Sequence, residues 1–162
     1  MTFTKQITPY TCSLACLESF YRDHGNRTTQ QSLLQDHPDK CFVGRIVDGR
    51  DISGALSREE FRFLCVDLGL APFVGHDFRP EITIPFIQGV QQREAIIFFI
   101  THFGGSNGPT HYVRFSHMTG ADVFQVMNPS DNPQFLPITW QQFVAWDTWF
   151  VRITLPNEPG NA

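Results

Sequence analysis

The sequence predicts an α+β fold in which N-terminal helices pack on a C-terminal antiparallel sheet. Up to residue 70 the apolar side chains recur at helical spacing, whereas the apolar segments after residue 93 are short and rich in β-branched and aromatic residues. The chain has 162 residues, of which 41% are hydrophobic and 17% are charged. This length and composition indicate one globular domain that spans residues 1–162.

Two helices are predicted at the start of the chain. The first covers residues 12–24, CSLACLESFYRDH, where the apolar residues fall on one face and Gly25 supplies a terminator. A shorter helix over residues 28–37 ends before Pro38, because proline cannot continue a helix.

A third helix is predicted after a Gly- and Asp-rich passage, residues 43–56, which has the composition of a loop. Ser57 and Glu60 form the pattern of a capping box at its start, and Gly69 marks its end.

The second half of the chain predicts a sheet. The expected strands are residues 94–101, 110–118, 122–127 and 148–155. The sequence TGAD at residues 119–122 indicates a tight hairpin between the second and third of these strands. A short helix with a Thr139–Gln142 capping box is expected before the last strand, and residues 156–162 are expected to form a disordered tail.

Composition argues against several classes of partner. The formal net charge is −4 and Lys and Arg form no run, so a nucleic-acid partner is not expected. The longest apolar run, AIIFFI, has the length of a strand and not of a membrane span. The N-terminus lacks the apolar segment of a signal peptide. We therefore expect a cytoplasmic protein, or one secreted by a bacterial system that is independent of signal peptides.

The cysteines indicate reduced thiols and no cofactor. They are Cys12, Cys16, Cys41 and Cys65, too few for a disulfide scaffold in a chain of this length. His37 and Cys41 are the one His/Cys pair with spacing that suggests a metal, and no second pair completes four ligands. Neither a metal nor another cofactor is expected.

Cys12 is the candidate nucleophile, because it opens the first predicted helix. The positive end of the helix dipole favours a thiolate there. Gln6 lies six residues earlier, and its side-chain amide can join the Cys12 backbone N–H in holding an oxyanion. The alternative is that Cys12 is a buried structural thiol and Gln6 a surface amide.

His111 is the candidate general base. It begins one strand of the predicted hairpin, and Asn128 follows the partner strand, so the Asn128 carbonyl oxygen can hold the imidazole N–H. A Cys, a His and an orienting amide form the papain-like variant of a catalytic triad. His102 and His117 remain alternative bases, and Asp131 remains an alternative orienting residue.

Three segments resemble the C39-type peptidases. QITPYTCSLACLESFYRDHG is similar to the N-terminal motif of that family, in which a glutamine precedes Cys-Gly-x-Ala-x-Leu, although Ser13 stands where the family has glycine. ISGALSREEFRFLCVDLGL is similar to the family's middle helix and turn. THYVRF and VFQVMNP resemble its His-containing strand and its Asp-Pro turn, with Asn128 in place of the aspartate. The resemblance covers roughly residues 4–150.

This resemblance implies a papain-like, C39-like cysteine protease fold. It implies that Cys12 is the nucleophile, His111 the base, Asn128 the orienting residue and Gln6 the oxyanion donor. The expected activity is hydrolysis of an amide bond in a peptide or protein through a thioester. A glutamine deamidase-type bacterial effector and a catalytically inactive peptide-binding module are the alternatives. Because no phosphate-binding loop or membrane span is recognisable, a free-standing domain without a transporter is expected.

Overall fold

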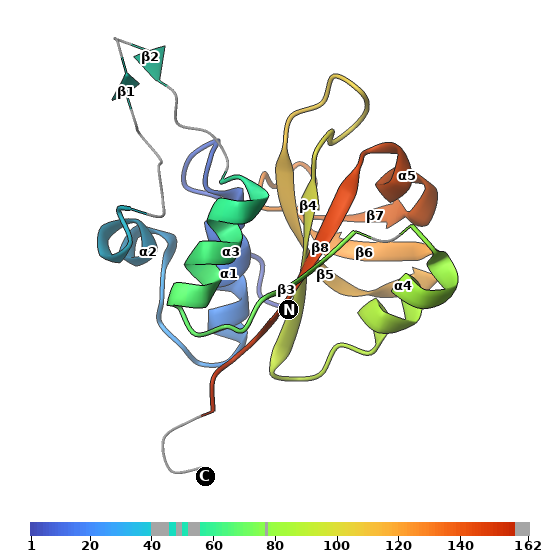
Figure 1. Cartoon of the computed structure of the whole chain (residues 1–162), viewed down its shortest axis with the longest axis horizontal. Helices are drawn as coiled ribbons and strands as arrows, with labels where there is room; N and C mark the ends of the chain where they lie inside the picture. Colours follow the sequence, from blue (N-terminus) through green and yellow to red (C-terminus); the bar gives the residue numbers. More distant parts are fainter. Residues whose placement is uncertain (40–45, 48–49, 52–55, 77, 158–162) are drawn as a thin grey trace.

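A six-stranded antiparallel sheet lies between two groups of helices in the computed structural model (Figure 1). The structure describes residues 1–39, 46–47, 50–51, 56–76 and 78–157. The helices are α1 (Cys12–Asp23), α2 (Gln30–Asp36), α3 (Arg58–Asp67), α4 (Pro80–Gln88) and α5 (Trp140–Ala145). Helices α1 to α3 lie on one side of the sheet, and α4 and α5 lie on the other (Figure 1).

The sheet has the strand order β3-β8-β4-β5-β6-β7. Its strands are β3 (Phe73–Gly75), β4 (Glu94–Ile100), β5 (His111–Gly120), β6 (Val123–Met127), β7 (Phe135–Thr139) and β8 (Thr148–Thr154). A separate two-stranded sheet joins β1 (Ile46–Val47) to β2 (Arg50–Asp51). The predicted strands and the hairpin between β5 and β6 are therefore present.

Strand β4 explains why one sheet carries two hydrophobic cores. Its residues Ala95, Ile97 and Phe99 pack into the core on the α1–α3 side. The alternate residues, among them Ile96 and Phe98, pack into the core on the α4–α5 side. Successive side chains of a strand point to opposite faces, so a strand buried on both faces is apolar throughout.

The predicted helix ends are also present. Both α1 and α3 close with a glycine at positive φ, Gly25 at 71° and Gly69 at 72°. In each case the two backbone hydrogen bonds of a Schellman motif satisfy the last carbonyl groups. The capping boxes predicted for Ser57 and Thr139 are both formed.

Several elements were not predicted. Helix α4 has Pro80 in its first turn, where proline is tolerated, but β-branched residues and Pro85 obscure its helical pattern. Strand β7 contains Pro137, which is acceptable because β7 lies at the edge of the sheet. Short strands β1 and β2 lie within the passage expected to be a loop. Most of that passage, Cys41 and the end of the tail lie outside the described residues.

An ion pair holds α1 against β5. Arg114 Nη1 lies 2.6 Å from Asp23 Oδ2 and donates to Ser19 Oγ at 2.8 Å. Burial alone would raise the pKa of Asp23, but hydrogen bonds from Thr2 and Arg114 outweigh it and lower that pKa. The pair fixes α1 beside the strand that begins with His111.

No helix in the described ranges combines the length and the apolar character needed to cross a lipid bilayer.

Candidate active site

Cys12 is the first residue of α1, and the start of this helix carries no side-chain cap. Thr11 occupies the cap position, but its Oγ1 accepts from the Thr8 backbone N–H at 3.0 Å instead. The same hydroxyl donates to the Thr8 carbonyl at 3.2 Å. Both hydrogen bonds of the Thr11 hydroxyl are therefore made within the turn before the helix. The hydroxyl accepts no hydrogen bond from the first backbone N–H groups of α1.

The Cys12 thiol is buried and protonated. The residue is only 1% exposed and belongs to the core on the α1–α3 side. Burial raises its pKa to about 11, although the backbone N–H groups of Tyr112, Ser13 and Cys12 itself oppose this by lowering the pKa. The helix start favours the thiolate, as the sequence predicts, but desolvation has the larger effect on the pKa in this structure.

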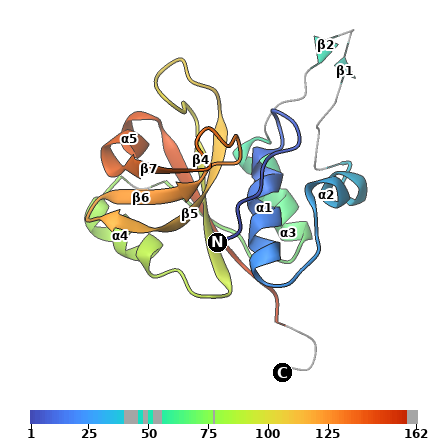
Figure 2. The ribbon, with the colours of Figure 1, turned by 180° about the vertical axis from the view of Figure 1, so that it is seen from behind.

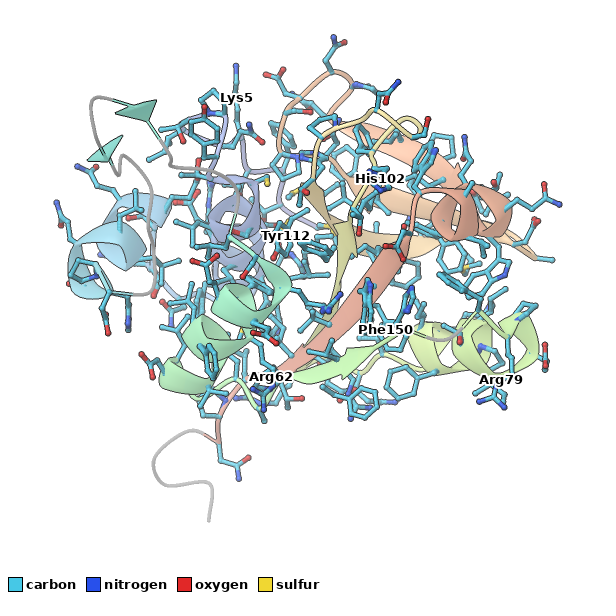
Figure 3. The ribbon with its side chains drawn as sticks, turned by 45° about the horizontal axis from the view of Figure 1, so that its top comes forward. Lys5, Arg62, Arg79, His102, Tyr112 and Phe150 are labelled. Atoms are coloured by element: carbon cyan, nitrogen blue, oxygen red, sulfur yellow. The ribbon has the colours of Figure 1, made fainter. Side chains whose placement is uncertain are left out.

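The Tyr112 contact brings the thiol to the peptide bond that joins Tyr112 to the candidate base, His111. The Tyr112 N–H that lowers the Cys12 pKa belongs to the peptide bond between His111 and Tyr112. The Tyr112 side chain is buried between the helices and the sheet (Figure 3), and its hydroxyl donates to the carbonyls of Leu56 and Ser57 at 2.8 and 3.1 Å. Tyr112 thus connects the start of β5 to both α1 and the start of α3.

His111 and Asn128 form a defined hydrogen-bonded pair. His111 Nε2 lies 2.7 Å from Asn128 Oδ1. The orientation of the amide follows from its other end, where Asn128 Nδ2 donates to the Pro133 carbonyl at 3.0 Å. Ser130 Oγ also donates to Asn128 Oδ1, at 2.8 Å. Because an oxygen faces the imidazole, Nε2 carries the proton and Nδ1 is the basic nitrogen of the neutral ring.

His111 is neutral at pH 7. Burial lowers its pKa below the ordinary value of 6.5, and the bond to Asn128 raises it by a smaller amount. The residue is 7% exposed, and its ring lies against Phe103, with 4.8 Å between the ring centroids. Phe103 in turn packs on Trp146. These aromatic rings limit access of water to the imidazole.

Gln6 is fixed through its backbone and not through its side chain. Its N–H donates to the Pro129 carbonyl at 3.0 Å, beside Asn128. The side-chain Oε1 is buried without a hydrogen-bond partner. Within the part of the chain that the structure describes, the Gln6 side-chain amide forms no hydrogen bond. A buried polar group without a partner is uncommon in folded proteins and calls for a functional explanation.

The alternative residues lie in other environments. His102 lies in the loop beyond β4 (Figure 3), and its N–H donates to the Trp146 carbonyl. His117 is exposed and contacts the Ser116 hydroxyl. The Asp131 carboxylate forms a 3.0 Å ion pair with Lys5. Of the candidate orienting residues, Asn128 is the one that is hydrogen-bonded to His111.

Sequence reasoning missed the residues that support this arrangement. Ser130 and Pro133 orient the Asn128 amide, and Tyr112 contacts the thiol. Gln30 holds the backbone on both sides of Gln6. Ser130 lies in the NPSD turn, where a side-chain bond to Asn128 is a common turn motif. The roles of the Pro133 carbonyl and of Gln30 depend on the tertiary fold, so no local pattern indicates them.

In the described ranges, no group of three or more His, Cys, Asp or Glu side chains is arranged to hold a metal ion.

The arrangement is suited to nucleophilic chemistry. It combines a thiol, a neutral imidazole held by an amide, uncapped N–H groups at a helix start and a second amide without a partner. Such a set can accept a proton from sulfur and stabilise negative charge on a carbonyl oxygen.

The similarity of this chain to known proteins is found in its structure and not in its sequence. No protein-family model matches the chain, and no curated protein sequence is significantly similar to it. The peptidase domain of Streptococcus ComA, a bifunctional ABC transporter involved in a quorum-sensing pathway, superposes with a TM-score of 0.66 at 10% identity, covering 96% of this chain and 100% of that one.

Two further structures have the same fold. A C39-like peptidase from Bacillus anthracis matches with a TM-score of 0.59 at 10% identity, over 97% of this chain and 96% of that one. A double glycine motif protease from an AMS/PCAT transporter, solved with its leader peptide, matches with a TM-score of 0.54 at 14% identity, over 94% and 91%. The predicted fold class is confirmed: over nearly its whole length, this chain has the papain-like fold of C39 peptidase domains.

Proposed function

We propose that this chain is a single-domain cysteine hydrolase that cleaves an amide bond in a peptide or protein. The observation that carries the proposal is the His111–Asn128 pair, 2.7 Å apart, at the peptide bond that contacts the Cys12 thiol. This pair gives the imidazole one fixed tautomer, with its basic nitrogen available for the thiol proton. The Ser130 and Pro133 contacts fix the Asn128 amide so that its oxygen faces the imidazole.

The reaction begins with a neutral pair. The pKa of Cys12 is raised to about 11 and that of His111 is lowered, so thiol and imidazole are both uncharged at pH 7. Cys12 Sγ attacks the substrate carbonyl carbon while its proton moves to His111 Nδ1. The C=O π electrons move to oxygen, and the Cys12 N–H and the Gln6 side-chain amide stabilise the resulting oxyanion.

Collapse of this intermediate expels the amine. The C–N bond breaks, the amine takes the proton from His111, and the acyl group remains on sulfur as a thioester. Water then attacks the thioester, giving one proton to His111, and the C–S bond breaks. The thiolate recovers that proton from His111, which returns both groups to their starting forms.

Burial imposes a condition on this mechanism. Because Cys12 is 1% exposed, a substrate carbonyl reaches the sulfur only after neighbouring groups move aside. The loop between β4 and β5 lies next to His111 and contains Gly104 and Gly105 at φ values of 89° and 140°. We infer that this loop opens for the substrate, as loops at active sites commonly do.

A peptide or protein substrate is supported by the structural neighbours. Each of the three is described as a peptidase or protease, and one was solved with a leader peptide. The same thioester chemistry on a glutamine side chain would release ammonia and would be deamidation.

The test compares wild-type protein with Cys12→Ala on a complex protein extract. New N-termini and glutamine-to-glutamate conversions are both mapped by mass spectrometry. We expect new N-termini that require Cys12, concentrated in few proteins. Cys12-dependent glutamate formation without cleavage would assign the chain as a deamidase, and no Cys12-dependent product of either kind would indicate an inactive peptide-binding module.

A further inference from the structure

Gln30, the first residue of α2, holds the chain on both sides of Gln6. Gln30 Nε2 donates to the Lys5 carbonyl at 2.8 Å, and Gln30 Oε1 accepts from the Ile7 N–H at 3.1 Å. Gln30 is 2% exposed, so its side chain is shielded from bulk water. A buried amide with both ends bonded is held in a single orientation.

These bonds fix the two peptide groups that flank Gln6. The peptide between Lys5 and Gln6 is bonded at its oxygen by Gln30 and at its N–H by the Pro129 carbonyl. The following peptide is bonded at its N–H by Gln30. Little freedom is left to the φ and ψ angles of Gln6, and its side chain therefore starts from a fixed Cα–Cβ direction.

The location of this segment explains why its rigidity matters. The N-terminal segment runs beside α1 to the end at which α1 begins (Figure 2). There the chain turns at Thr8–Thr11 and enters the helix at Cys12. The Gln6 side chain takes no recorded bond in the described part of the chain, and its Oε1 is buried without a partner.

We propose that Gln30 is a positioning residue, which acts through Gln6 to set the oxyanion donor for attack at Cys12. This inference rests on the proposed hydrolase function and adds a residue to it. Donors that stabilise an oxyanion must be in place before the charge develops, and small displacements reduce the rate strongly. Gln30 supplies this pre-organisation from a different helix.

Two reagents separate oxyanion stabilisation from thiol reactivity. Acetylation of Cys12 by p-nitrophenyl acetate passes through a tetrahedral oxyanion. Alkylation by iodoacetamide displaces iodide at a saturated carbon and forms no such charge. Both rates can be followed at the Cys12 peptide by mass spectrometry, and their ratio reports the oxyanion donors in variants that are folded to the same extent as the wild-type protein.

We expect Gln6→Ala to slow acetylation about 100-fold. We expect Gln30→Met, which keeps the side-chain length but removes both bonds, to slow acetylation about tenfold. Alkylation should stay within about twofold of wild type in both, since no oxyanion forms. Gln31→Ala, on the exposed neighbouring position of α2, should change neither rate. Gln30→Glu, which keeps the acceptor for the Ile7 N–H, repeats the test if Gln30→Met does not fold.

The double variant Gln6→Ala/Gln30→Met is decisive. If Gln30 acts through Gln6, this variant is acetylated no more slowly than Gln6→Ala alone. Independent, multiplying effects would overturn the proposal, as would an unchanged acetylation rate in Gln30→Met or Gln6→Ala, or a parallel loss of alkylation. Failure of the proposed function has a different signature, namely acetylation of wild-type protein elsewhere than at Cys12.

Discussion

The two ends of α1 are built in opposite ways. At its C-terminal end, Asp23 pairs with Arg114 at 2.6 Å and Gly25 completes a Schellman motif. The ring nitrogens of His24 lie 2.9 Å from the Phe20 carbonyl and 2.6 Å from the Gln92 carbonyl. At the N-terminal end, no side chain caps the helix. The C-terminal end of the helix is hydrogen-bonded to its surroundings, and the N-terminal end has no side-chain cap.

The open end is not explained by a lack of suitable residues. Thr11 is of the type that caps helices well, and Thr29 and Thr139 do cap α2 and α5. Ser57 does the same for α3. A missing cap costs about 1 kcal/mol of stability. The helix start is therefore left without a side-chain cap where the proposed chemistry requires free N–H groups, while the far end of α1 holds the helix in place.

Breaking the ion pair at the C-terminal end of α1 should have the largest effect, which is on stability. Asp23→Ala leaves the buried Arg114 charge without its carboxylate partner, so we expect the free energy of unfolding to fall by about 3 kcal/mol. Urea denaturation measures this change. The folded-state pKa of Asp23 lies below its ordinary value, so in wild-type protein the stabilisation is present above pH 4 and is lost as the pH falls.

Asp36→Ala is the matched control, because Asp36 is an exposed acid in the last turn of another helix. It should change stability by less than about 0.5 kcal/mol. Equal effects of the two substitutions would show that the ion pair does not hold α1 in place.

Loss of the Asn128 side-chain amide should have the next largest effect, which is on the rate of the reaction. In Asn128→Ala the imidazole is free to rotate, so we expect kcat for p-nitrophenyl acetate hydrolysis to fall about 100-fold. The Asn128 bond raises the pKa of His111 against the effect of burial. Its removal should therefore lower that pKa further, and the acid limb of the kcat/KM profile should move to lower pH.

Asp131→Ala serves as the control, since that carboxylate pairs with Lys5. It should leave kcat and the acid limb near their wild-type positions. A large loss in Asp131→Ala with none in Asn128→Ala would transfer the orienting role to Asp131.

Much of the fold followed from local patterns. The helical spacing before residue 70, the two capping boxes and the glycine at the end of α1 each depend on residues only a few positions apart. The sequence therefore predicts them well. Asn128 was also predictable as the partner of His111, because a tight hairpin brings the ends of its two strands together.

The remaining features depend on contacts between distant segments. Arg114 and Asp23 are 91 residues apart, and Gln30 acts on residues more than 20 positions earlier. The effect of burial on the Cys12 thiol could not be predicted for the same reason. A helix start is visible in the sequence, but the burial that raises the pKa of the thiol exists only after the sheet has packed against α1.

In the proposed mechanism, the start of α1 and Gln6 together stabilise the oxyanion formed by attack of Cys12. A structure of the protein with acetyl-glycyl-glycinal tests it directly, because this aldehyde has no side chain that requires a specificity pocket. We predict a covalent bond to Cys12 Sγ, with the hemithioacetal oxygen about 2.7–3.1 Å from both the Cys12 N and the Gln6 Nε2. A bond to another cysteine, or an oxygen directed away from both donors, would contradict this mechanism.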